Sequence, residues 1–246
     1  MSDLKYGFQS DIGKLRENNE DGYLASGELF AVADGMGGQV GGEVASRLAL
    51  ETLAEDMSRE LPRVKNLTAL LKKSFSRANR LILEKSLKET NLRGMGTTLT
   101  ALVVSENKTE EKMAYVAHIG DSRAYLLRTG KFTQLTEDHS VVAQMVREGK
   151  LSPEEAEVHP LKSVLTRALG TEDMVEVDVI PLPLETGDKI LLCTDGLPNM
   201  LSDDEIRALL EKEDSPQDIC DELVRVANDR GGIDNVTVVI VARSWD

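Results

Sequence analysis

The sequence predicts an α+β fold in which antiparallel sheets are covered by helices. Apolar, strand-like runs follow one another directly along the chain. Stretches with helical periodicity come in pairs and do not alternate singly with the strands. Parallel neighbours need a long crossover between successive strands, whereas antiparallel neighbours do not. This order therefore favours a layered antiparallel sandwich over a doubly wound parallel sheet.

The N-terminal part is expected to hold strands followed by a pair of long helices. Strand-like runs cover 4–10 and 22–34. From Glu43, apolar residues at spacings of three and four predict a helix that Pro62 ends. A second helix follows, with one apolar face made of Leu67, Leu70, Leu71, Phe75, Ala78 and Ile82. Both stripes are typical of core packing.

Strands dominate the middle of the chain. They are expected at 97–104, 113–119, 123–128 and 132–135. The turn residues Gly120-Asp121-Ser122 separate the second of these strands from the third. Their composition predicts a hairpin-like turn that pairs the two strands.

The C-terminal part alternates between short helices and strands. Helices are expected over 139–150, from Ser152-Pro153, from Ser202 to Leu210, and from Ser215-Pro216. Ser152 and Ser202 each precede a glutamate by three residues, which predicts a capping box at the start of a helix. Strands are expected at 175–180, 189–194 and 236–242.

Composition excludes several classes of protein. The net charge of −14 argues against binding nucleic acid through its phosphates. The two cysteines, Cys193 and Cys220, both lie in apolar surroundings and predict no disulfide framework. The N-terminus has no apolar signal core, and no apolar run approaches the roughly 20 residues that span a bilayer. We therefore expect a cytoplasmic protein without membrane contact.

Four aspartates, each beside glycine or asparagine, are the most informative feature: Asp21, Asp34, Asp195 and Asp234. Three of them adjoin strand-like runs, so their carboxylates project from the rim of a sheet. Gathered together, such acids repel one another by roughly 4 kcal/mol per pair at 4 Å. They then need cations, and oxygen ligands select hard ions such as Mg²⁺ or Mn²⁺. For a single Asp-Gly the alternative is a simple turn, but the set predicts a metal site.

The aspartates belong to a series of short motifs spread along the chain. These are Ser10-Asp11-Ile12-Gly13 with Arg16 and Asn19-Glu20-Asp21; Asp34-Gly35-Met36-Gly37-Gly38; Met95-Gly96-Thr97-Thr98; Gly120-Asp121-Ser122-Arg123; Asp138-His139-Ser140; Thr166-Arg167-Ala168-Leu169-Gly170; Asp195-Gly196-Leu197; and Gly232 with Asp234-Asn235. In this order they resemble the bacterial metal-dependent protein phosphatases of the type 2C (PPM) family, nearly from end to end.

The resemblance implies a four-layer αββα sandwich with two central antiparallel sheets. It implies a single catalytic domain over 1–246, with a flap at about 139–171. Because 246 residues leave no room for an attached sensory domain, we expect the catalytic domain to be free-standing. It also implies hydrolysis of phosphoserine and phosphothreonine in proteins by a monomeric enzyme that opposes serine/threonine kinases. The expected cofactors are two Mn²⁺ or Mg²⁺ ions, with a third, weaker ion in bacterial relatives.

The resemblance also assigns roles to individual residues. Metal ligands would be Glu20, Asp21, Asp34, the Gly35 carbonyl, Asp121, Asp195 and Asp234. Asp34 matches the carboxylate shared by both main ions, and Asp121 matches a ligand of the third. Arg16 matches the guanidinium that grips the substrate phosphate, while Thr98 and Asn235 would support the ligands. From the residues alone, Arg16 could instead be a surface arginine and Asp121 could cap its own turn.

In such a site, a water between two divalent cations becomes hydroxide near neutral pH and attacks phosphorus directly. No side chain is required as nucleophile. Two other functions stay open at this point. One is a catalytically silent domain that binds phosphoproteins, and the other is a phosphatase dedicated to an anti-sigma antagonist.

Overall fold

Two antiparallel sheets form the centre of the molecule in the computed structural model, which describes residues 4–106 and 111–244. The first sheet runs in the order β1 (Leu4–Asp11), β11 (Val236–Arg243), β10 (Lys189–Cys193), β7 (Arg123–Arg128) and β8 (Lys131–Gln134). The second runs β2 (Asp21–Ser26), β3 (Leu29–Met36), β5 (Leu99–Glu106), β6 (Lys112–Ile119) and β9 (Asp178–Pro183), with β4 (Gly96–Thr97) paired to β3.

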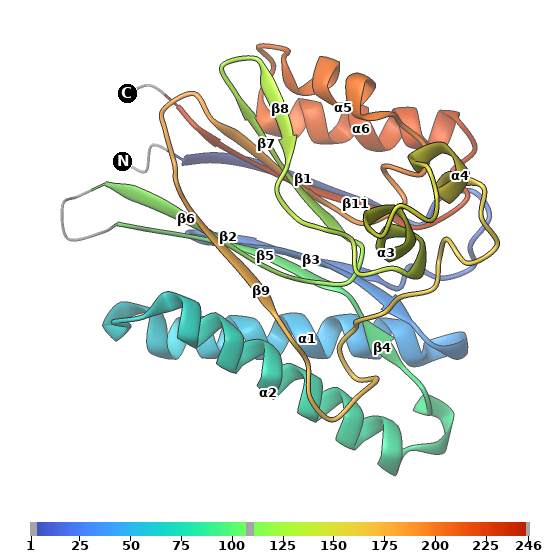
Figure 1. Cartoon of the computed structure of the whole chain (residues 1–246). Coiled ribbons are helices and arrows are strands. Elements are labelled where there is room, and N and C mark those ends of the chain that lie inside the picture. The colour runs from blue at the N-terminus through green and yellow to red at the C-terminus, as the bar shows by residue number, and fades with distance from the viewer. Residues whose placement is uncertain (1–3, 107–110, 245–246) are drawn as a thin grey trace.

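A pair of helices covers the outer face of each sheet, so the molecule has four layers (Figure 1). The second sheet is covered by α1 (Gly38–Glu60) and α2 (Leu67–Lys88), and the first by α5 (Asp203–Leu210) and α6 (Pro216–Asp229). Short 3-10 turns, η1 (Leu61–Arg63) and η2 (Thr90–Leu92), follow the two long helices. The expected αββα sandwich is confirmed.

The central strands are apolar on both faces because each sheet lies between two layers. In β3, Phe30 and Val32 point into the core between the sheets, while Ala31 and Ala33 face the helices. In β11, Val239 likewise packs between the sheets and its neighbours pack under α5 and α6. Successive side chains of a strand point to opposite faces, so a strand covered on both faces needs a continuous apolar run.

The prediction of a hairpin at Gly120-Asp121-Ser122 is wrong. Strand β6 belongs to the second sheet and β7 to the first, so these three residues cross from one sheet to the other. Strand β7 instead forms its hairpin with β8. Since both β6 and β7 are buried on two faces, their side-chain pattern does not reveal which strand each one pairs with.

Two element boundaries also differ from expectation. Helix α1 begins at Gly38, before the expected Glu43, because packing against the sheet overrides the low helix propensity of glycine. Strand β9 covers Asp178–Pro183, whereas the sequence predicted 175–180. Its prolines are tolerated because β9 pairs only with β6, at the edge of the sheet.

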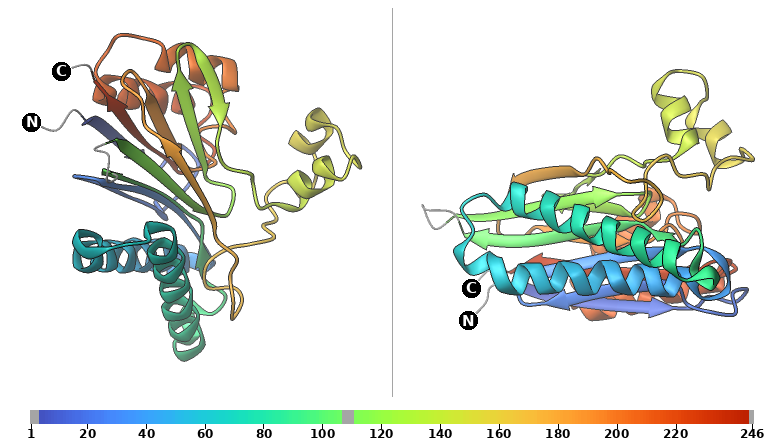
Figure 2. Two further views of the ribbon diagram at one scale, coloured as in Figure 1. Left: turned by 60° about the vertical axis from the view of Figure 1, so that its left-hand side comes forward. Right: turned by 90° about the horizontal axis from the view of Figure 1, so that it is seen from below.

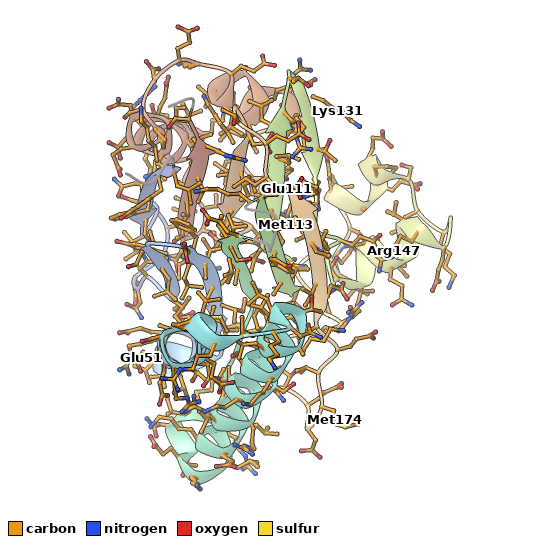
Figure 3. All side chains as sticks on the ribbon, turned by 90° about the vertical axis from the view of Figure 1, so that its left-hand side faces the viewer. Glu51, Glu111, Met113, Lys131, Arg147 and Met174 are labelled. Atoms are coloured by element: carbon orange, nitrogen blue, oxygen red, sulfur yellow. The ribbon has the colours of Figure 1, made fainter. Side chains whose placement is uncertain are left out.

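A segment with two short helices, α3 (Val141–Arg147) and α4 (Pro153–Glu157), stands out from the body in Figure 2. Ser140 caps α3, and the predicted capping box at Ser152 is present at α4. The two ends of this segment pair as an isolated bridge between Ser140 and Leu165. We call residues 140–166 the projecting segment, and Arg147 marks it in Figure 3. None of the described helices is long and apolar enough to cross a membrane.

Candidate metal centre

One cavity of about 440 Å³ brings together most of the residues that the sequence singled out. Its lining residues are Arg16, Glu20, Asp34, Gly35, Met36, Gly37, Thr98, Asp121, Ser163, Leu165, Asp195 and Asp234. Of the ten predicted site residues, Asp21 and Asn235 alone do not line it. Both lie directly behind its wall, as their hydrogen bonds show below.

The fold collects these residues because the strands that carry them end at the same side of the two sheets. Asp34 lies near the end of β3, and Asp21 begins the neighbouring antiparallel strand β2. In the other sheet, Asp195 follows β10 and Asp234 precedes β11, which are also antiparallel neighbours. Asp121 lies on the connection that crosses between the sheets.

Hydrogen bonds from Thr97 and Thr98 fix the backbone of Asp34, and Asp34 lines the cavity. The Asp34 N–H donates to Thr98 Oγ1 at 2.9 Å, and the Thr98 N–H donates to the Asp34 carbonyl at 2.9 Å. The Thr97 hydroxyl also donates to that carbonyl, at 2.9 Å. Gly35 approaches α1 so closely that an added Cβ would lie 2.1 Å from the Gly42 carbonyl. Glycine is therefore required beside this carboxylate.

Asn235 ties together the loops that carry the other acids. Its Oδ1 accepts from the Glu20 N–H at 2.8 Å, and its Nδ2 donates to the carbonyls of Ile12 and Asn18 at 2.9 and 3.0 Å. The Asn235 N–H donates to Asp234 Oδ1 at 2.8 Å. Asn235 thus holds Glu20 through its side-chain amide and Asp234 through its backbone N–H, without lining the cavity itself.

Asp21 is held by a residue of the opposite sheet. The hydroxyl of Thr194 donates to Asp21 Oδ2 at 2.8 Å and accepts from the Thr237 N–H at 2.9 Å. Sequence reasoning assigned no role to Thr194 beyond its place before Asp195. The hydroxyl of Thr194 directly precedes the predicted ligand Asp195, which could have marked it as a supporting residue. Its partner Asp21 is distant in the sequence, so the contact itself could not be predicted.

Arg16 extends over the mouth of the site. Its side chain is 51% exposed and its guanidinium binds Asp234 Oδ2 at 2.7 Å. On the other side, the Asn199 amide donates to Asp195 Oδ2 at 3.0 Å. Ser163 and Leu165 reach the same cavity from the projecting segment. No local sequence pattern indicates where that segment folds back, so neither residue could be placed in the site from the sequence.

Burial first, and then the charges of neighbouring acids, raise the pKa values of the carboxylates in the cavity. Burial raises the pKa of Asp34 well above its usual range, and the charges of Asp21, Asp195 and Asp121 raise it further. Burial raises the pKa of Asp21 to about 7 and that of Asp121 to about 8, and the charge of Asp195 adds to both shifts. Burial and Asp234 raise the pKa of Asp195 as well. The cavity thus favours either protons or cations on its carboxylates.

The donor set fits hard divalent cations. Asp21 Oδ1 and Asp195 Oδ1 are buried without a hydrogen-bond partner, which is costly for a carboxylate oxygen unless something binds it. Among residues 4–106 and 111–244, no group of three or more acidic, histidine or cysteine side chains is already assembled to hold a metal ion. An open, oxygen-lined site of this kind suits ions that keep several water ligands, as Mg²⁺ does.

The histidines take no part in lining the cavity. His118 is fully buried in β6 and bonds Thr100 Oγ1 at 2.9 Å and the Glu137 carbonyl at 3.1 Å. His139 is also buried, and its partners are described below.

Comparison with known proteins places this geometry in a family. Residues 17–235 match the family "Protein phosphatase 2C". The serine/threonine phosphatase stp of Listeria welshimeri is 38% identical over 244 residues, covering 96% of this chain and 95% of the relative. The crystal structure of the Mycobacterium tuberculosis phosphatase PstP/Ppp superimposes with a TM-score of 0.90 at 40% identity, covering 98% of this chain and 99% of that one.

A further crystal structure, of the PstP catalytic domain in complex with two manganese ions, has a TM-score of 0.88 and 39% identity and covers 98% of this chain and 99% of that one. The match to the family extends over most of the sequence, and the likeness in sequence and structure extends nearly from end to end. The chain belongs to the protein phosphatase 2C family.

Proposed function

We propose that this protein is a Mn²⁺- or Mg²⁺-dependent phosphatase that removes phosphate from phosphoserine and phosphothreonine in proteins. The observation that carries the proposal is the cavity in which acids from distant parts of the chain meet beside Arg16. Relatives that cover nearly the whole chain are named serine/threonine phosphatases, which supports the same reaction.

The proposed metal ligands are the acids that line the cavity or stand behind its wall. Asp34 would be shared by two ions, with the Gly35 carbonyl on one of them. Asp195 and Asp234 would hold the first ion, and Glu20 with Asp21 the side of the second. Asp121, together with Asp195, would hold a third, weaker ion. The two buried, unpartnered oxygens of Asp21 and Asp195 are support for ligand roles at these two positions.

When bound, the divalent cations lower the pKa of a coordinated water and neutralise charge on the phosphate. Arg16 can present its planar set of donors to two phosphate oxygens, which aligns the ester for in-line attack. Its guanidinium already lies at the cavity mouth against Asp234. Thr98 and Asn235 keep the backbones of Asp34 and Glu20 and the carboxylate of Asp234 in place. These are the roles that a preorganised site requires of its supporting residues.

The hydroxyl of Ser122 and the two thiols are poorly placed to act as nucleophiles. Ser122 is fully buried, and its Oγ is bonded to Thr98 Oγ1 at 2.7 Å. Cys193 and Cys220 are buried, and burial raises the pKa of each thiol to about 12. A covalent intermediate on any of these three buried groups therefore does not fit this cavity, whereas direct attack by water on phosphorus needs none of them.

The wider assignments follow from the reaction. The substrates are phosphorylated proteins, and serine/threonine kinases would supply them. We propose a monomer that acts in the cytoplasm without binding membrane or nucleic acid, built as one catalytic domain over 1–246. The projecting segment would be its flap, at about 139–171, because it contributes Ser163 and Leu165 to the cavity.

The test compares phosphate release from matched phosphothreonine, phosphoserine and phosphotyrosine peptides in Mn²⁺. We expect turnover of the first two, and a loss of about two orders of magnitude or more in the Asp34→Asn protein, since ligand loss exceeds the 10–100-fold typical of supporting residues. A folded protein that binds the phosphopeptides but releases no phosphate would overturn the proposal in favour of a silent binding domain.

A further inference from the structure

The dipeptide Asp138-His139, at the root of the projecting segment, has no role in the site described so far. The His139 side chain is 1% exposed, and His139 bonds the backbone of Gly120, the residue before Asp121, once through its own backbone N–H and once through its ring. The backbone N–H of His139 donates to the Gly120 carbonyl at 2.7 Å, and the backbone N–H of Gly120 donates to Nδ1 of the His139 ring at 3.1 Å.

These bonds define the proton positions on the ring. Because the Gly120 N–H donates to Nδ1, that nitrogen must carry its lone pair, so the proton of the neutral ring lies on Nε2. Nε2 is 2.9 Å from Asp178 Oδ2 and donates to it. Burial lowers the pKa of His139, in keeping with a neutral ring.

The connection that carries Asp121 is fixed on both sides of that residue. Gly120 has φ +111°, and a Cβ there would lie 2.5 Å from Thr98 Cγ2, so the connection is wedged against the threonine that holds Asp34. Beyond Asp121, the Arg123 guanidinium makes hydrogen bonds of 2.8 to 3.1 Å to the Asp138 carboxylate. Asp138-His139 therefore holds this connection at two points.

His139 also helps to join the two ends of the projecting segment. The Thr166 N–H donates to the His139 carbonyl at 2.8 Å, next to the bridge between Ser140 and Leu165. Asp178, the partner of Nε2, also binds Arg167 at 3.3 Å. His139 thus joins the connection bearing Asp121 and the start of β9 through its ring, and the root of the projecting segment through its backbone carbonyl.

We propose that His139 is a positioning residue for Asp121, acting through the lone pair of Nδ1 on the Gly120 N–H and coupling the Asp121 connection to the root of the projecting segment. The role in catalysis rests on the proposed phosphatase function, but the geometric role does not. Loss of the Nδ1 acceptor leaves the Gly120 N–H unpaired and frees the Asp121 backbone.

Two substitutions separate the contacts of the ring. The amide of Asn reaches the place of Nδ1 and can accept from Gly120, whereas the amide of Gln reaches the place of Nε2 and can only serve Asp178. We expect His139→Asn to keep kcat and Mn²⁺ affinity close to those of the parent. His139→Gln should lose on the order of 10-fold or more in kcat with KM little changed, and should bind Mn²⁺ more weakly in calorimetric titration.

His159 provides the matched control, because it lies in the projecting segment and its ring bonds only locally, to the Leu161 N–H at 3.1 Å. His159→Gln should leave both measurements unchanged. Equal losses in His139→Asn and His139→Gln would reduce His139 to a packing residue and overturn the proposal, as would full activity in both.

A second measurement uses the parent protein, so it does not depend on whether the His139 variants fold. Nitrogen-15 NMR of the parent near neutral pH should show one histidine ring protonated at Nε2 alone, with Nδ1 accepting a hydrogen bond. His118 and His159 are identified through their own substitutions. A His139 ring protonated at Nδ1 would overturn the proposal. This result stands whether or not the protein hydrolyses phosphopeptides, so failure of the phosphatase assignment is distinguished from failure of this one.

Discussion

Asp21 lies directly opposite Asp34 in the antiparallel pair of β2 and β3. Directly opposed side chains on neighbouring strands have Cβ atoms about 5 Å apart, and like charges in that position destabilise a sheet. The pairing of β2 with β3 therefore places two mutually repelling carboxylates at the centre of the site, and Asp195 adds to the repulsion from the other sheet. Cations would resolve this conflict, and so would protons.

The first prediction concerns pH and the stability of the metal-stripped protein. The folded pKa values of Asp21 and Asp121 are about 7 and about 8, above the roughly 3.9 of an unfolded aspartate. Between these values the folded state binds more protons than the unfolded chain, so stability falls as pH rises from about 4 to about 8. The unfolding temperature in chelator should be lower at about pH 8 than at about pH 5.5.

Saturating Mn²⁺ should raise the unfolding temperature most at the upper end of this range, where protons no longer neutralise the acids. Replacing both Asp21 and Asp121 by Asn should flatten the pH dependence in chelator. A stripped protein that grows more stable between about pH 5.5 and pH 8 would show that other groups dominate the titration.

The second prediction separates function from stability at Asp34 and Asp195. Changing either to Asn keeps its size but removes the charge that attracts cations, so kcat should fall by orders of magnitude. In chelator at about pH 8 the same change removes repulsion and should not lower the unfolding temperature. Thermal unfolding and peptide hydrolysis are measured on the same samples. An Asp34→Asn protein that retained most of its kcat would remove Asp34 from the proposed ligand set.

The third prediction concerns Arg16. Its replacement by Ala removes charge-assisted hydrogen bonds to phosphate of about 1.5–3 kcal/mol, so kcat/KM for a phosphopeptide should fall on the order of 10- to 100-fold, mainly through KM. The affinity for Mn²⁺ should change little. Arg47, an exposed arginine on α1, is the matched control, and its change to Ala should have no effect. An unchanged KM in Arg16→Ala would make Arg16 a surface arginine.

The fourth prediction concerns the projecting segment, which is weakly anchored and carries exposed apolar side chains such as Val158, 83% exposed. Replacing Val142 to Lys150 with a short Gly-Ser bridge should change selectivity among phosphopeptides, since weakly anchored segments next to a site often contact bound ligands. Hydrolysis of p-nitrophenyl phosphate, which is too small to reach α3, should change much less. Parallel losses on both substrates would point to damage at the cavity or the fold.

Local patterns predicted much of this molecule, and the exceptions have physical causes. Asp34 and Asp195 could be recognised because a glycine follows each one at the end of an apolar run. The strand that pairs with β7 could not be recognised from the sequence. Strands buried on both faces lack the alternation of apolar and polar side chains that would indicate a neighbouring strand. The bond from Thr194 to Asp21 joins two sheets across the core, and no spacing along the chain encodes such a contact.

Returning Mn²⁺ to chelator-stripped protein, while following phosphate release from a phosphothreonine peptide, tests most directly whether this cavity is a metal-dependent phosphatase site. We predict no turnover in the stripped protein above that of Asp34→Asn. Activity should return as the ion is added and reach its maximum with at least two ions bound per chain, the number in the related PstP catalytic domain. Undiminished hydrolysis in the thoroughly stripped protein would contradict the proposed mechanism.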